Sequence, residues 1–334
     1  MKTGKLSESV LKRSVFKRIK AKSPDLLLSP GVGGDASAFE AAEDEAIVSA
    51  SGAFPDLEGD QVFYPVNIAV NNLAAAGADP IGIRVTGLLP ETVEEAELKV
   101  LSDEIARLCG DLGIRPLGGH TQVTAAVDRP VITVTALGRV KKDKLLSSAG
   151  AKAGDEIVVT KWIGLGGTGI LANEKEEIIS QKFKQELINR AKLFPEQISV
   201  LPEAKAAASN KVHAMHDLSQ GGIYNGLWEM AEASKAGLTV DIKKIPIRQE
   251  TVEVCEIFDI NPYRLFSAGS MLIAVPDGEG LVKALEDAGI SASVIGRFTD
   301  SNDRIIMNGD EVTYLDSPKQ DELIRIKTEW RESL

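Results

Sequence analysis

The chain has 334 residues, of which 43% are hydrophobic and 26% are charged, a balance typical of globular domains. Acidic residues outnumber basic residues by 49 to 38, and a formal net charge of −11 argues against a nucleic-acid partner. No apolar run approaches the roughly 20 residues that cross a bilayer, and no secretory signal opens the chain. We therefore expect a cytoplasmic protein with no membrane partner.

Helical and strand-like patterns alternate through the first half. A helix with a basic, solvated face is predicted around residues 11–22. A glycine-rich loop, "GVGGDASAF", is followed by predicted strands and helices. The strands are expected over 45–50, 80–89 and 129–140, and the helices over 66–78 and 92–113.

The second half begins after a polar stretch rich in small residues, 141–156, where we place the boundary between domains 1–148 and 149–334. Strands are expected over 156–162, 238–242, 270–276 and 291–299, and helices after "GLGGTG", up to about Leu193, within 216–237 and over 278–290. This order is not a strict β-α-β-α alternation. It favours an α+β (mixed α/β) fold with partly antiparallel sheets.

Taken one at a time, the glycine clusters are not specific. "GVGGD" lacks the lysine of a P-loop. "GLGGTG" follows a strand, but no β-α-β unit with a ribose-binding acid at the expected offset is evident. Glycines do let successive backbone N–H groups converge on an anion.

Several motifs in a fixed order are more informative: "GVGGDASAF", "NNLAAAGADP", "GGHTQVT", "AGDEIVVT", "GLGGTGILA", "HDLSQGG" and "VIGRFT". This series resembles the aminoimidazole ribonucleotide (AIR) synthetase, or PurM-like, superfamily, and is most similar to its HypE-like and AIR synthase-related members. The resemblance implies an N-terminal domain that forms a homodimer through a strand array, and a C-terminal α/β sandwich. It also implies ATP in a cleft between the domains, with magnesium on aspartates.

The resemblance assigns site residues position by position. Asp35 would contact magnesium or phosphate, with capping of a following helix as the alternative. Candidates for holding the ligand are Gly31, Gly33, Gly34, Asp35, Asn72, Gly118, Gly119, Thr121, Gln122, Asp217, Gly221 and Gly222. His120 and His216 are the catalytic candidates, with local hydrogen bonding as the alternative role of each.

Three positions depart from the family pattern, because Ser51-Gly52, Asn72 and Gln122 stand where a carboxylate is expected. Neutral amides offset the charge of Mg²⁺·ATP less well than carboxylates, so we predict weak or absent Mg²⁺·ATP turnover. No cysteine follows Cys255, so the self-modifying dehydratase reaction of HypE does not carry over. Cys109 and Cys255 are expected to be core residues, as are Trp228 and Met230, whereas His213 is expected on the surface.

The leading prediction is a HypE-like protein that binds ATP or another phosphorylated small molecule. One alternative is an active ATP-dependent small-molecule kinase or cyclo-ligase. The other is a catalytically silent partner protein in enzyme maturation.

Overall fold

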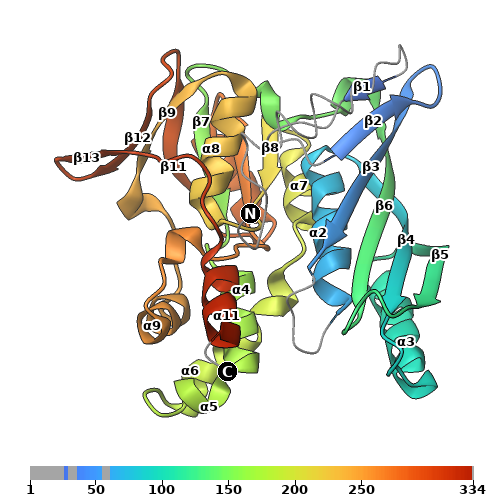
Figure 1. Cartoon of the computed structure of the whole chain (residues 1–334). Coiled ribbons are helices and arrows are strands. Elements are labelled where there is room, and N and C mark those ends of the chain that lie inside the picture. Colours follow the sequence, from blue (N-terminus) through green and yellow to red (C-terminus); the bar gives the residue numbers. More distant parts are fainter. Residues whose placement is uncertain (1–25, 29–35, 55–60, 333–334) are drawn as a thin grey trace. The chain divides into compact units, whose positions relative to one another are not determined.

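The computed structural model describes residues 26–28, 36–54 and 61–332. The predicted basic helix and the loop residues Gly31, Gly33, Gly34 and Asp35 lie outside the described residues. The described residues form two compact units, with the division between Leu145 and Leu146 (Figure 1).

The N-terminal unit is built on a six-stranded sheet with the order β1-β2-β3-β6-β4-β5. All neighbouring strands are antiparallel except β4 and β5, which are parallel. Its strands are β1 (Leu26–Leu28), β2 (Ala36–Glu40), β3 (Glu45–Ala53), β4 (Asp79–Leu89), β5 (Arg115–Val123) and β6 (Val131–Lys141), and its α-helices are α2 (Phe63–Ala75) and α3 (Glu95–Asp111).

Helix α2 packs on one face of this sheet. Buried and more exposed residues alternate along β3 and β6, the pattern of strands with one covered face. Gly52 of β3 lies against α2 so closely that an added Cβ would stand 2.2 Å from the Pro65 carbonyl oxygen. Helix α3 begins with a capping box between Glu94 and Glu97, which satisfies free N–H groups of its first turn.

The C-terminal unit contains a seven-stranded sheet with the order β13-β12-β9-β11-β7-β10-β8. Only the β9–β12 pair is parallel. The strands are β7 (Glu156–Thr160), β8 (Ala214–Asp217), β9 (Gly237–Asp241), β10 (Met271–Val275), β11 (Ala292–Thr299), β12 (Arg304–Asn308) and β13 (Glu311–Tyr314).

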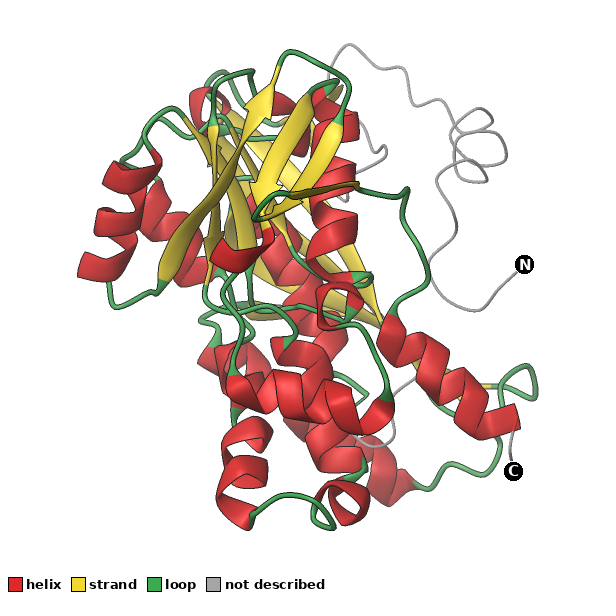
Figure 2. Cartoon of the chain, turned by 90° about the vertical axis from the view of Figure 1, so that its left-hand side faces the viewer, coloured by secondary structure: helices red, strands yellow, loops and turns green. Residues whose placement is uncertain are grey.

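The helices of this unit differ in where they pack. They are α4 (Leu165–Glu174), α5 (Glu176–Ile179), α6 (Gln185–Lys192), α7 (Leu201–Ala207), α8 (Gly222–Ser234), α9 (Gln249–Phe258), α10 (Gly278–Asp287) and α11 (Glu322–Glu332). Leu227 and Met230 of α8 share one apolar core with β7, β9, β10 and β12, whereas α4, α5, α6, α9 and α11 gather beyond one end of the sheet (Figures 1 and 2). All five residues of β10 are buried.

The mixed α/β class with two sheets is confirmed, and so are most predicted elements. The helix predicted after "GLGGTG" is α4, whereas the long charged helical stretch predicted up to about Leu193 is divided into two helices, α5 and α6. The glycines of "GLGGTG" do not form an anion-binding loop, because Gly166, Gly167 and Gly169 are buried inside α4. Added Cβ atoms there would come within 2.5–2.8 Å of Phe266, Leu265 and Pro195. These glycines serve close packing.

Candidate functional site

His120 and Gln122 lie on the edge strand β5, and every residue of β5 is exposed. Their side chains are joined, with His120 Nε2 3.2 Å from Gln122 Oε1. The register places His120 beside Thr86 of β4, which pairs with Thr133 of β6. All three residues are exposed.

The neighbouring row of residues points the other way, because successive side chains of a strand alternate between the two faces. In this row Gly52 pairs with Val134, which pairs with Val85 and then Gly119. Gly52 lies against α2, so His120 and Gln122 lie on the face of the sheet opposite to α2.

Asn72 belongs to α2 and is buried, as are Asn67 and Asn71 of the same helix. The Asn67 amide donates to the Phe63 carbonyl oxygen at 2.9 Å. The structure therefore does not bring Asn72 and Gln122 together on one face of the N-terminal sheet. Of the other motif residues, Thr121 pairs with Gly87, and Gly118 has a positive φ of 98°.

Among the described residues, no group of three or more His, Cys, Asp or Glu side chains could hold a metal ion. At Gly52 a carboxylate side chain has no room, because an added Cβ would stand 2.2 Å from the Pro65 carbonyl oxygen; the neighbouring Ser51 is exposed and supplies a hydroxyl instead. The described part of the N-terminal unit thus does not fit a carboxylate-bound magnesium ion, which prefers hard oxygen ligands.

His216 lies on β8, and it is buried in a polar network. Its Nδ1 is 3.2 Å from the Ser148 hydroxyl, and its Nε2 is 3.2 Å from Oε2 of Glu229 on α8. Ser148 also donates to the Met215 carbonyl and accepts from Ser234 through its own carbonyl oxygen. With a partner at each ring nitrogen, His216 joins β8, α8 and the segment around Ser148, which is the local role named as its alternative.

His213 is not a simple surface residue. Its side chain is only 23% exposed, and its Nδ1 lies 2.9 Å from the buried carboxylate of Asp155. The expected core positions of Cys109, Cys255, Trp228 and Met230 are confirmed by their burial. Burial raises the pKa of the Cys255 thiol to about 12, so this cysteine is a poor nucleophile at neutral pH.

The motif "HDLSQGG" leads directly into α8. Gly221 has a φ of 85° and Gly222 a φ of 63°, conformations that a side chain would disfavour. The Gly221 N–H is already used: it donates to Oδ2 of Asp321 at 2.5 Å. The chain's own carboxylate therefore lies where the sequence predicts a ligand anion.

Asp321 was missed by sequence reasoning. It precedes the apolar residues of α11, and its Oδ1 accepts from the Leu323 N–H at 2.8 Å, so the helix-start pattern could have identified it as a cap. Its contact with Gly221, a hundred positions away in the chain, has no signal in the sequence. Burial raises the pKa of the Asp321 carboxyl to about 7, against the opposing effect of the N–H donors of Gly221, Leu323 and Ile324.

Comparison with known proteins assigns the chain to a family. Residues 64–140 match the AIR synthase related protein N-terminal domain, and residues 152–308 match the C-terminal domain of the same family. The chain belongs to the AIR synthase-related family with its PurM-like fold. No helix in the described residues is long and apolar enough to cross a membrane.

Among curated proteins, the chain is 26% identical over 318 residues to a Methanocaldococcus jannaschii protein whose name places it with hydrogenase expression/formation proteins. That alignment covers 91% of each chain. Carbamoyl dehydratase HypE of Rhodobacter capsulatus is 27% identical over 68% of this chain and 66% of its own length.

Solved structures share the fold. HypE of E. coli superposes with a TM-score of 0.73 at 21% identity, covering 96% of this chain and 100% of its own. HypE in a HypE–HypF complex gives 0.73 at 19% identity, over 93% and 100% of the two chains. The protein AaThiL, in complex with AMPPCP and TMP, gives 0.71 at 16% identity, over 95% and 96%.

Proposed function

We propose that this protein binds ATP, or another phosphorylated small molecule, as a member of the hydrogenase-maturation branch of its family. The observation that carries the proposal is the alignment over 91% of both chains with the M. jannaschii hydrogenase expression/formation protein. Two fold neighbours support the nucleotide part: a HypE in complex with ATP and AaThiL in complex with AMPPCP. The candidate residues are those that the sequence assigns in each unit.

We further propose that binding depends little on magnesium. Ser51-Gly52, Asn72 and Gln122 carry no charge, and the described residues contain no carboxylate cluster. Asp35 is then the one family-matched acid in the glycine loop. The open Gln122–His120 pair offers donors and acceptors without the negative charge that would repel a phosphate.

Titration calorimetry with ATP, with and without magnesium, tests this proposal. We expect the two dissociation constants to differ by less than about tenfold, or ~1.4 kcal/mol. Asp44→Ala removes an exposed carboxylate of the N-terminal unit and serves as the matched control for Asp35→Ala. Tight binding that requires magnesium and is lost only in Asp35→Ala would contradict weak magnesium dependence. ATP turnover by the purified protein would instead favour the kinase or cyclo-ligase alternative.

A homodimer is also proposed. Among the described residues, the face of the N-terminal sheet that carries Thr133, Thr86 and His120 has no helix over it, and the edge strand β5 is exposed. Light scattering after gel filtration should give twice the chain mass of 35.7 kDa. Thr133→Arg should give the monomer mass, because it places a charge in the middle of the proposed interface, whereas Lys99→Ala on α3 should not. A wild-type monomer would overturn the dimer.

A partner protein is the second candidate function. A fold neighbour of this chain was solved as a HypE–HypF complex. If this chain does not bind ATP but co-purifies with a second protein in a stable complex, that result would favour the partner role over nucleotide binding.

A further inference from the structure

A short segment crosses the start of α8 in the C-terminal unit. Residues 316–321, here called the acidic strap, join β13 to α11. The Asn225 side chain of α8 makes two hydrogen bonds to the backbone of Lys319 in the strap. Its Nδ2 donates to the Lys319 carbonyl at 3.1 Å, and its Oδ1 accepts from the Lys319 N–H at 3.3 Å. Asp321, the last residue of the strap, accepts a hydrogen bond from the Gly221 N–H.

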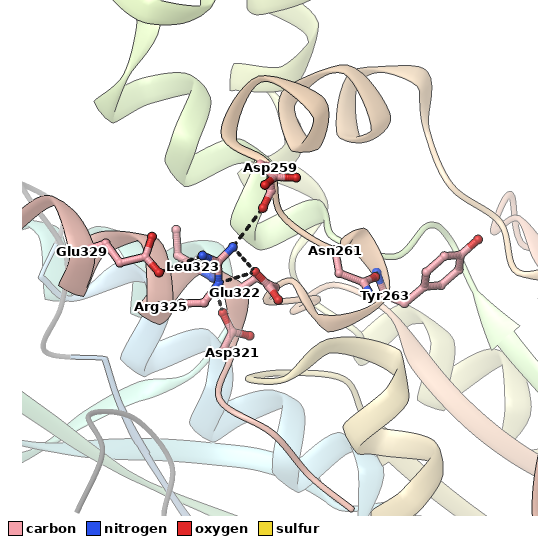
Figure 3. A network of polar contacts seen from close by, with 8 residues as sticks. All are labelled: Asp259, Asn261, Tyr263, Asp321, Glu322, Leu323, Arg325 and Glu329. Carbon is pink, nitrogen blue, oxygen red and sulfur yellow. Dashed lines mark hydrogen bonds and ion pairs between the residues drawn. The ribbon is translucent and has the colours of Figure 1, made fainter. Parts of the chain in front are cut away.

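The Asp321 carboxylate lies between the starts of two helices. Oδ2 accepts from Gly221 before α8, and Oδ1 accepts from Leu323 in the first turn of α11. Each helix start carries a partial positive charge and free N–H groups, the combination that binds phosphates and carboxylates. Asp321 is 4% exposed, and Figure 3 shows it beside Glu322 and Arg325, where the strap enters α11. Because the pKa of the Asp321 carboxyl is about 7, an anion of the chain itself fills this position above that pH.

A second positive group near the start of α8 is also covered by the strap. Arg264 approaches Asp316 through Nη2 at 3.4 Å, a long contact, and its guanidinium lies 5.3 Å from the centre of the Tyr224 ring. Its Nη1 is buried and has no hydrogen-bond partner among the described residues. The residue is adjacent to the helix start, because a Cβ on Gly222 would meet the Arg264 carbonyl carbon at 3.0 Å.

The strap therefore supplies one carboxylate to each positive group. Asp321 is bonded to Gly221, and Asp316 faces Arg264 while also pairing with Lys319 at 2.5 Å. Asp316 is exposed, and an exposed ion pair contributes little to stability. This end of the strap is the weakly held one.

We propose that the acidic strap is an autoinhibitory segment: it occupies the anion position at the start of α8, and a phosphorylated ligand uses Gly221 and Arg264 only when it displaces Asp321 and Asp316. This inference rests on the proposed binding of a phosphorylated ligand. A ligand that must first displace an internal competitor binds with an apparent affinity reduced by the fraction of molecules in which the strap is open. Asp321→Ala removes the competitor and should tighten binding.

ATP is the probe. Titration calorimetry compares the wild type with Asp321→Ala, Asp321→Asn and the matched control Asp277→Ala. Asp277 caps α10 by accepting from the Gly280 N–H at 3.0 Å, so its loss removes a similar helix cap away from α8. We expect the dissociation constant to fall about fivefold or more in Asp321→Ala, to fall less in Asp321→Asn, and to stay unchanged in Asp277→Ala. Circular dichroism verifies folding.

Hydrogen exchange of the wild type gives a readout that does not depend on any variant. Peptides that cover the strap and the start of α11 should exchange faster when ATP is added. ATP binding by the wild type without faster exchange, and with equal or weaker affinity in the folded Asp321 variants, would overturn the strap and leave the proposed function intact. ATP binding by none of these proteins would overturn both.

Discussion

Replacing Lys327 with alanine is expected to destabilise the C-terminal unit by about 3–5 kcal/mol, because it removes the ammonium group that pairs with a buried carboxylate. Lys327 Nζ on α11 lies 2.6 Å from Glu174 Oε2 on α4, and the two side chains are only 4% and 7% exposed. Urea unfolding, followed by circular dichroism, measures the loss.

Two further variants separate the loss of the ion pair from a general sensitivity to mutation. Lys99→Ala breaks the Lys99–Glu95 pair, whose side chains are 71% and 80% exposed, and should cost less than about 1 kcal/mol. The double variant Lys327→Met, Glu174→Leu removes both charges and should recover most of the stability. A loss near that of Lys99→Ala would show that the buried pair is not needed.

The second large effect is a dependence of stability on pH caused by Asp321. Burial raises the pKa of its carboxyl from 3.8 to about 7 in the folded state, so the folded protein binds this proton more tightly than the unfolded chain does. The stabilisation is complete below about pH 4 and is lost as the pH rises to about 7. The expected total is ~4 kcal/mol, at ~1.4 kcal/mol per pH unit.

Urea unfolding between about pH 4 and pH 8 measures this effect as a difference between the wild type and Asp321→Asn. Asparagine cannot titrate, whereas carboxyls whose pKa is lowered, such as Asp316 beside Lys319, are common to both proteins. The difference between the two curves should decrease as the pH rises. A difference that is constant or increases would show that Asp321 is not held protonated.

Much of the fold could be predicted because its signals are local. The alternation along β3 and the apolar stripe of α3 identify single elements, and the ordered motifs identify the family. The glycines of α4 were harder to interpret, because the same residues suit a phosphate loop and a close helix contact. Only the contacts with Leu265 and Pro195, distant in the chain, distinguish the two.

The candidate site was less predictable, because its decisive contacts are long-range. His216 has the expected motif around it, but the Ser148 and Glu229 partners that occupy its ring come from other segments. Asn72 and Gln122 lie in two expected motifs. Asn72 belongs to α2, whereas Gln122 lies on the face of the sheet opposite to α2. Sheet register decides this placement, and the motifs carry no information about register.

The glycines of α4 also affect the order in which the C-terminal unit can fold. Each interior glycine lowers helix propensity by about 1 kcal/mol relative to alanine, so Gly166, Gly167 and Gly169 together make this segment a poor helix former as an isolated peptide. The helical conformation of this segment depends on packing against the side chains of Leu265, Phe266 and Pro195. Helix α4 should therefore become stable late in folding, after those distant segments have docked.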